Sequence, residues 1–137
     1  MNKLVYLASP YSHPDPSVQD QRFKDVSRCA AILMECGVLV FSPIAHFTPI
    51  AIHGYLPHGW EFYAPFDTAY IHISQALLVA CFDGWQESKG VKAECDIARE
   101  LGLPIGFIPE PLDADLMRHY VRSAGLCSIP ETRREIV

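Results

Sequence analysis

The sequence predicts an α/β fold, a three-layer sandwich in which helices cover both faces of a central parallel sheet. Short apolar segments alternate with longer segments whose apolar residues recur at helical spacing, between residues 4 and 123. This alternation is typical of βαβ units. The chain has 137 residues, half of them hydrophobic and a fifth charged, as expected for a globular protein with one core. We therefore expect residues 1–137 to form a single domain.

The first βαβ unit is expected at the start of the chain. Leu4–Ala8 is a short apolar strand, and Ser9–Ser17, which contains three prolines, is a loop. A helix is expected from Val18 to Gly37, because apolar residues mark one face and glycine commonly ends a helix. Val38–Phe41 is the second strand. A strand, a helix and a strand in this order indicate a parallel pair with a right-handed crossover.

The segment Pro43–Gly59 lacks clean periodicity. It holds three prolines and three histidines among apolar residues, and we expect a long, partly helical loop beside the active site. The spacings of His46, His53 and His58 fit no compact metal motif, and no cysteine is near. We therefore favour a polar lid over a zinc site, and no metal is expected.

The second half of the chain continues the alternation. We expect a helix at Trp60–Ser74, bent near Pro65, and a third strand at Ala76–Phe82. The remaining expected elements are a helix at Gly90–Leu101, a strand at Ile105–Ile108, a helix at Leu112–Ser123 and an unassigned tail from Leu126. This order is close to that of flavodoxin-like folds, in which ligands bind at the carboxyl ends of the strands.

Charge and cysteine content exclude several classes of partner. The formal net charge is −5 and no block of Lys or Arg stands out, so a nucleic-acid polymer is not expected. No apolar run reaches the length of a membrane helix, so no membrane partner is expected either. The five cysteines show no CxxC spacing and are expected to be core residues in a reducing cytoplasm.

Glu94 is the first catalytic candidate. It lies on or beside an apolar stripe of the Gly90–Leu101 helix, just after the third strand. Open α/β sheets bind ligands at such positions. A carboxylate there can form a covalent glycosyl intermediate or stabilise an oxocarbenium-like centre. The structural alternative is a glutamate near the helix start whose charge interacts favourably with the helix dipole.

Ser88 and Gly90 stand at the start of the same helix. A serine followed by a glycine is typical of a capped helix start. With open backbone N–H groups, the same residues can hold a phosphate, and we expect an anion there. The sequence contains neither a GxGxxG motif nor a P-loop, so no dinucleotide or ATP site is predicted and no cofactor is expected.

Asp67 and Tyr6 are candidates because of their surroundings. Asp67 lies among apolar residues of the Trp60–Ser74 helix, where a carboxyl group is unusual unless that position faces solvent. Tyr6 lies in the first strand, close to the expected crevice. Tyrosines are common in strands, so Tyr6 by itself is only a weak indication of a site.

Two loops supply the remaining candidates. Ser9, Pro10 and Tyr11 follow the first strand and should border the crevice. Asp83 follows the third strand in an Asp-Gly pair, which is chiefly a turn signal. Trp85 can stack on a base or cover the edge of the core.

Three stretches, VYLASPYS, FDTAYIHISQALLVACF and GWQESKGVKAECDIARELGLPI, resemble the nucleoside 2-deoxyribosyltransferase superfamily, nearest to a small uncharacterised bacterial family within it. The likeness spans about residues 4–108. Its most specific part is the Ser-x-Gly-Val-x-x-Glu run from Ser88 to Glu94, which also resembles the branch that hydrolyses 2′-deoxynucleoside 5′-monophosphates. In the superfamily a helix glutamate attacks the anomeric carbon and displaces the base.

The resemblance implies roles for individual residues. It makes Glu94 the nucleophile, Asp67 the acid near the base and Tyr6 the residue that orients the glutamate, with Ser88 and Gly90 as sugar or phosphate contacts. The transferase branch carries an aspartate where this chain has Ser88, so we expect hydrolysis rather than base exchange. The first loop also lacks the glycine-rich run of the monophosphate hydrolases. The implied substrate is a nucleoside or a (deoxy)nucleoside 5′-monophosphate.

Three classes of function remain open from the sequence. The chain can be an N-glycosidic-bond enzyme, a nucleotide-binding or signalling module without turnover, or an enzyme of unrelated chemistry that uses the same crevice. We also expect a homo-oligomer, because the Trp60–Ser74 helix has more large apolar side chains than one face usually buries. These are Trp60, Phe62, Tyr63, Phe66, Tyr70 and Ile73.

Overall fold

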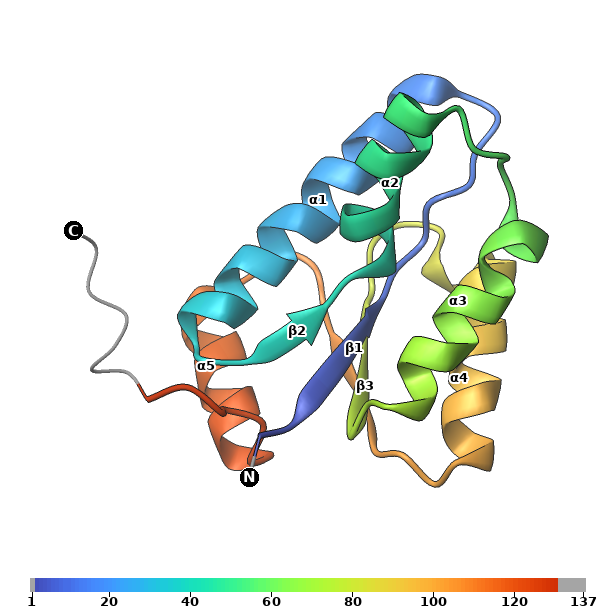
Figure 1. The fold of residues 1–137 in the computed structure, drawn as a ribbon. Helices are drawn as coiled ribbons and strands as arrows, with labels where there is room; N and C mark the ends of the chain where they lie inside the picture. The colour runs from blue at the N-terminus through green and yellow to red at the C-terminus, as the bar shows by residue number, and fades with distance from the viewer. Residues whose placement is uncertain (1, 131–137) are drawn as a thin grey trace.

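A four-stranded parallel sheet forms the centre of the computed structural model, which describes residues 2–130 (Figure 1). The order across the sheet is β2-β1-β3-β4, and β1 pairs with both of its neighbours in parallel. This arrangement confirms the predicted α/β fold with flavodoxin-like order. The strands are β1 Leu4–Ala8, β2 Leu39–Phe41, β3 Ala76–Ala80 and β4 Ile105–Ile108.

Helices cover both faces of the sheet. On one side, α1 and α5 pack on the sheet and α2 packs against α1, while α3 and α4 lie side by side on the other (Figure 1). The helices are α1 Pro16–Glu35, α2 Pro43–Gly54, α3 Trp60–His72, α4 Lys89–Glu100 and α5 Ala114–Ser123, with a short 3-10 helix at Trp85–Glu87. The three predicted layers are therefore present.

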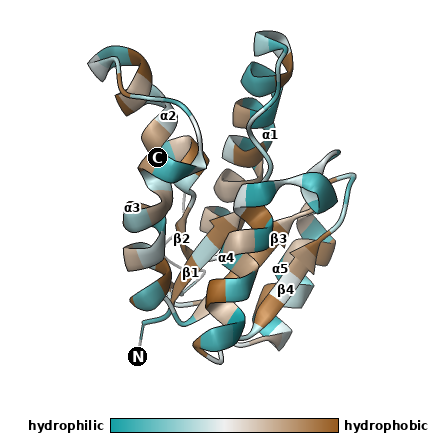
Figure 2. Ribbon diagram, turned by 90° about the vertical axis from the view of Figure 1, so that its right-hand side faces the viewer, coloured by the Kyte–Doolittle hydropathy of each residue, from teal (hydrophilic) through white to brown (hydrophobic). Residues whose placement is uncertain are grey.

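Alternation along the strands separates the interior into two cores. Val5 and Leu7 of β1 face α1 and α5, whereas Tyr6 and Ala8 face α3 and α4. All five residues of β3 are buried, as expected for a strand covered on both faces. Figure 2 shows the strands mostly in the brown of hydrophobic residues, whereas the helices mix teal and brown residues along their length.

The helix starts follow from capping residues. The Asp15 side chain accepts a hydrogen bond from the backbone N–H of Ser17 at 2.9 Å, and Pro16 occupies the first turn. Helix α1 therefore begins at Pro16 and not at Val18 as predicted. Asp113 caps α5 in the same way, so that helix begins at Ala114.

The expectation of a long loop at Pro43–Gly59 was largely wrong. Residues Pro43–Gly54 form the continuous helix α2, which contains Pro49, and the connection to α3 occupies only the following five positions. Ser42 caps the helix through Ala45 N–H at 3.1 Å, and Tyr55 ends it in the left-handed conformation, with φ of 53°. Periodicity is weak because one side of α2 packs on α1 while another lines a cleft.

Smaller differences lie at element ends. Strand β3 ends at Ala80 and not at Phe82. In the tail from Leu126, which the sequence left unassigned, Cys127 forms an antiparallel bridge with Val38 of the segment leading into β2. Residues 131–137 of this tail lie outside the described residues. No helix within residues 2–130 is long and apolar enough to cross a membrane.

Candidate active site

Glu94 and Tyr6 meet beneath the carboxyl end of the sheet. Glu94 projects from α4 and is only 4 % exposed, while Tyr6 in β1 is fully buried. The Tyr6 hydroxyl donates a hydrogen bond to Oε2 of Glu94. This contact joins residues 88 positions apart and fixes the carboxyl group against the central strand. Glu94 is thus held in a defined orientation, which a solvent-facing helix glutamate would not have.

Asp67 brings a second carboxyl group to the same place. It lies on α3, is 5 % exposed, and its Oδ1 atom is buried without a hydrogen-bond partner among the described residues. Burial raises the pKa of Asp67 to about 7, although the neighbouring Tyr6 hydroxyl acts in the opposite direction. An unpartnered buried oxygen costs stability, so it is a natural contact for a ligand.

Burial governs the protonation of the other two groups. It raises the pKa of Glu94 well above the usual range; the hydrogen bond from Tyr6 opposes this rise and the charge of Asp67 adds to it. Burial also raises the pKa of the Tyr6 hydroxyl, and both carboxylates reinforce the effect. Because the three groups influence one another, the two carboxyl groups titrate as a coupled pair and not independently.

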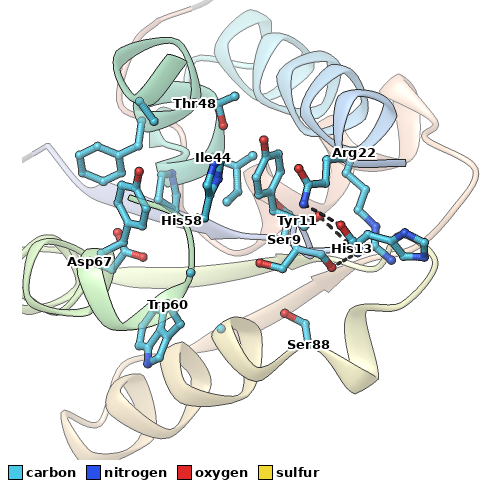
Figure 3. A pocket seen from close by; sticks show the side chains of 18 of the residues that line it. Ser9, Tyr11, His13, Arg22, Ile44, Thr48, His58, Trp60, Asp67 and Ser88 are labelled. Carbon is cyan, nitrogen blue, oxygen red and sulfur yellow. Dashed lines mark hydrogen bonds between the residues drawn. The ribbon is translucent and has the colours of Figure 1, made fainter. Parts of the chain in front are cut away.

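A cleft of about 870 Å³ opens above these groups. Its polar side comes from the loops after β1 and β3 and from the start of α4, and its apolar side comes from α2, α3 and the connection between them. In Figure 3 Ser9 lies between Asp67 on one side and His13 and Arg22 on the other. The cleft therefore has a polar end, at the loops after β1 and β3 and the start of α4, and an apolar end, at α2 and α3.

Four of the predicted binding residues line the cleft. Ser9 and Tyr11 follow β1, and Ser88 and Gly90 stand at the start of α4. The hydroxyl of Ser9 is buried without a partner among residues 2–130. A methyl group added at Gly90 would lie 3.7 Å from Trp60 and 3.9 Å from Oε1 of Glu94. The missing side chain of Gly90 thus keeps open the space in front of Glu94.

Three predicted binding residues are not brought to the cleft. Pro10 is buried and does not line the cleft, and Asp83 is exposed outside the cleft lining. Trp85 contacts Phe107 with ring centroids 5.7 Å apart and packs on the core under α4. Trp85 therefore covers the core edge in this structure, the structural alternative that its sequence left open.

Ser88 combines two possible uses. Its Oγ atom accepts a hydrogen bond from Val91 N–H at 3.2 Å, so it is the N-cap of α4. The hydroxyl proton is not used in that bond and remains available as a donor. Lys89 beside it is exposed, and the first turn of α4 contains no acidic residue.

Arg22 is a cleft residue that the sequence did not reveal. From α1 it donates to the carbonyl oxygen of Ser12 at 2.8 Å and to that of Asp83 at 3.2 Å. These bonds join the loops after β1 and β3. Gly84 has φ of 89°, and a Cβ atom there would collide with the Arg22 guanidinium. The partners are backbone carbonyls of distant loops, so no spacing in the sequence could indicate them.

The three histidines of the predicted loop occupy different environments. His58 lines the cleft, His46 packs against the rings of Phe41 and Phe47, and His53 is exposed. No group of three His, Cys, Asp or Glu side chains within residues 2–130 is arranged to hold a metal ion. The titratable groups that the structure brings together beneath the cleft are the carboxyl groups of Glu94 and Asp67 and the phenol of Tyr6.

Comparison with known proteins supports the fold. The family model described as "Domain of unknown function (DUF1937)" matches residues 3–109. The structure is similar to that of a 2-deoxyribosyltransferase from the bacterium Bacillus psychrosaccharolyticus, with a TM-score of 0.59, 20 % sequence identity, and coverage of 93 % of this chain and 98 % of the other. At this identity the likeness shows the fold alone. No curated protein matches the chain in sequence.

Proposed function

Because the chain belongs to the DUF1937 family, whose function is unknown, we propose an activity from the geometry of the cleft. The protein acts on the N-glycosidic bond of a nucleoside or (deoxy)nucleoside 5′-monophosphate, and it hydrolyses that bond rather than exchanging bases. The observation that carries the proposal is the buried Glu94–Tyr6 hydrogen bond beside Asp67. Resemblance of the sequence and fold to the nucleoside 2-deoxyribosyltransferases supports it.

The proposed reaction gives each carboxyl group its own role: Glu94 is the nucleophile, and Asp67 donates and then accepts a proton. Ionised Glu94 attacks the anomeric carbon, and the bond between that carbon and the base breaks. Protonated Asp67 donates its proton to the departing base. Water then attacks the ester between the sugar and Glu94, and its proton passes to Asp67. Glu94 leaves as a carboxylate and both groups return to their starting state.

Tyr6 explains how Glu94 can be ionised in so buried a position. Its hydroxyl donates to Oε2, which favours the carboxylate and leaves Oε1 for the attack. The reactive form of the pair carries one proton, on Asp67. The pKa of about 7 for Asp67 suits an acid that must hold a proton near neutral pH and release it in the reaction.

The direct test follows free base released from deoxynucleosides, ribonucleosides and their 5′-monophosphates. We expect release from at least one of these groups, and no release from any would overturn the enzymatic proposal. Saturable binding without release would instead support the alternative of a nucleotide-binding module. Base exchange that depends on a second base would replace hydrolysis with transfer.

A 5′-phosphate would bind at the start of α4. The N-terminal N–H groups of this 12-residue helix, the Ser88 hydroxyl and exposed Lys89 all favour an anion there. Ser88→Asp keeps an N-cap residue, so the helix should remain stable. The new carboxylate repels phosphate, so the preference for monophosphates should fall or reverse. Equal use of nucleosides and monophosphates by both proteins would contradict the phosphate site.

The protein forms a homo-oligomer in this proposal. Phe66 is 47 % exposed and Ile73 is 60 % exposed on α3, and Ile52 of α2 is 64 % exposed. Exposed apolar side chains of this size favour contact with a second copy. Sedimentation should give at least a dimer at micromolar concentration, and a monomer at that concentration would contradict the expectation.

A further inference from the structure

We infer that Arg22 is a positioning residue, which fixes the separation of the two loops at the polar end of the cleft. These loops are residues 9–15, after β1, and residues 81–84, after β3. The effect of Arg22 on catalysis rests on the proposed function, whereas the link between the loops can be measured in the protein without substrate.

Arg22 holds both loops through their backbones. Its Nη1 atom donates to the carbonyl oxygens of Tyr11 at 3.4 Å and Ser12 at 2.8 Å (Figure 3). Its Nη2 atom donates to the carbonyl oxygen of Asp83 at 3.2 Å. One nitrogen therefore serves the loop after β1 and the other the loop after β3. Because the guanidinium is rigid and planar, it sets how far apart the two loops lie.

The loop after β1 is anchored to α1 by a second side chain. Gln19 lies three residues before Arg22 on this helix, and its Nε2 atom donates to the carbonyl oxygen of His13 at 2.7 Å. The carbonyl groups of three successive residues, 11 to 13, are thus bound by side chains of α1. Arg22 extends this anchor to the loop after β3.

The loop after β3 is shaped to receive the guanidinium. Gly84 has φ of 89°, and a Cβ atom there would collide with Arg22. No carboxyl group within residues 2–130 forms a salt bridge with Arg22. The hydrogen bonds of Arg22 all go to main-chain carbonyl oxygens, as expected for a side chain that holds backbone in place.

The loop after β3 leads directly to the start of α4. Its short 3-10 helix ends at Ser88, whose N–H donates to the carbonyl oxygen of Trp85 at 3.4 Å and whose side chain caps α4. A shift of this loop moves Ser88 relative to Tyr11 on the opposite side of the polar end. A sugar held between them would then be displaced from Glu94, and a displacement of about 1 Å can lower a rate about a hundredfold.

Amide hydrogen exchange in the protein without substrate tests the link between the loops. Arg22→Lys keeps the positive charge but has a single nitrogen, and Arg22→Met removes both charge and donors. In both variants the amides of Trp85, Glu87 and Ser88, which are hydrogen-bonded in the turn, should exchange severalfold faster.

Arg28→Lys is the matched control. Arg28 lies on the same helix with its side chain 65 % exposed, and it pairs with Asp25 at 3.7 Å. Its substitution should leave exchange in the loop after β3 unchanged. If neither Arg22 variant folds, Gly84→Ala displaces the guanidinium from the other side and should speed exchange in the same turn.

Steady-state kinetics with the substrate that the protein cleaves fastest separate positioning from other roles. In both Arg22 variants kcat should fall about tenfold to a hundredfold while KM stays within about threefold. Wild-type kcat and exchange in Arg22→Lys would show that only the charge matters. A higher KM for 5′-monophosphates alone, with kcat retained, would make Arg22 a phosphate contact. Either result would overturn the inference.

The exchange measurement also separates this role from the proposed enzyme. Unchanged exchange in both Arg22 variants would overturn the inference even if the wild type releases base. Faster exchange in both variants, with no base released by the wild type from any substrate, would support the link between the loops and overturn the enzymatic proposal.

Discussion

The two faces of the sheet bury different kinds of side chain. The core under α1 and α5 contains aliphatic, aromatic and thiol groups, such as Leu7, Leu33 and Cys29. The face under α3 and α4 buries two carboxyl groups, Asp67 and Glu94, next to Tyr6. Buried carboxyl groups lower stability unless they are neutral or paired. Their confinement to one face, beneath a cleft, agrees with our proposal that this face carries the chemistry while the other contributes only to stability.

The largest expected effect comes from Glu94→Gln. The amide has nearly the same shape but cannot attack the anomeric carbon, so turnover should fall about ten-thousandfold or more. The free energy of unfolding should not decrease, because the variant removes a buried ionisable group. Base release and chemical denaturation measured on the same preparation separate the two effects.

Glu100→Gln is the matched control, since Glu100 is exposed at the end of the same helix. Glu100→Gln should change neither the rate of base release nor the free energy of unfolding. If Glu94→Gln unfolds the protein, or releases base as fast as the wild type, the contrast between the two faces is wrong.

Asp67→Asn should have the next largest effect. Loss of the acid should reduce kcat about a hundredfold to ten-thousandfold. In the wild type, activity should fall as the pH rises through about 7, where Asp67 loses its proton, and the variant should lack this alkaline limb. A pH profile of kcat for both proteins measures the difference.

Asp67 also affects stability in a defined pH window. Its pKa is about 7 when folded, against a reference value of 3.8, so the folded state binds more protons between these values. The contribution of Asp67 to the free energy of unfolding is fully present below pH 3.8 and is lost as the pH rises through about 7. Asp67→Asn should reduce this pH dependence, up to roughly 4 kcal/mol for three pKa units. An unchanged slope in denaturation between pH 5 and pH 8 would contradict the buried position of Asp67.

Leu33→Ala tests the opposite face. Leu33 on α1 is fully buried in the core under α1 and α5. Its truncation should lower the free energy of unfolding by about 2–5 kcal/mol, because it leaves a cavity. The kcat per folded molecule should stay within about twofold of the wild type. A large loss of kcat in a folded Leu33→Ala protein would show that the two faces are coupled.

Tyr6→Phe should have the smallest effect on activity among the three variants of the candidate site. It keeps the ring in the core and removes only the hydroxyl that donates to Glu94. A hydrogen bond to a charged group contributes about 1.5–3 kcal/mol, so kcat should fall about tenfold to a hundredfold. Because Glu94 loses the donor that favours its ionised form, the acid limb of the pH profile should move to higher pH. A pH profile with an unmoved acid limb would show that Tyr6 is only a packing residue.

The sequence predicts most of the fold because strands and helices leave local signals. The periodicity of α4 and the apolar run of β3 needed no tertiary information. Helix α2 was missed because its apolar residues face both α1 and the cleft, which removes the single stripe that marks a surface helix.

The candidate site was predictable in part for the same reason. Glu94 was indicated by its place on an apolar stripe, and Ser88 by capping chemistry. The position of Trp85 on the core edge and the contacts of Arg22 depend on loops far apart in the chain. Such contacts are set by tertiary packing and leave no local pattern.

Mass measurement of a trapped reaction intermediate shows whether Glu94 forms a covalent bond to the sugar. Wild-type protein is mixed with the substrate that it cleaves fastest, quenched in acid within milliseconds to seconds, and digested. Our account predicts that the peptide containing Glu94 gains the mass of one sugar or sugar phosphate, and that Glu94→Gln shows no such gain. Equal release of base by both proteins, with no modified peptide in either, would contradict the account.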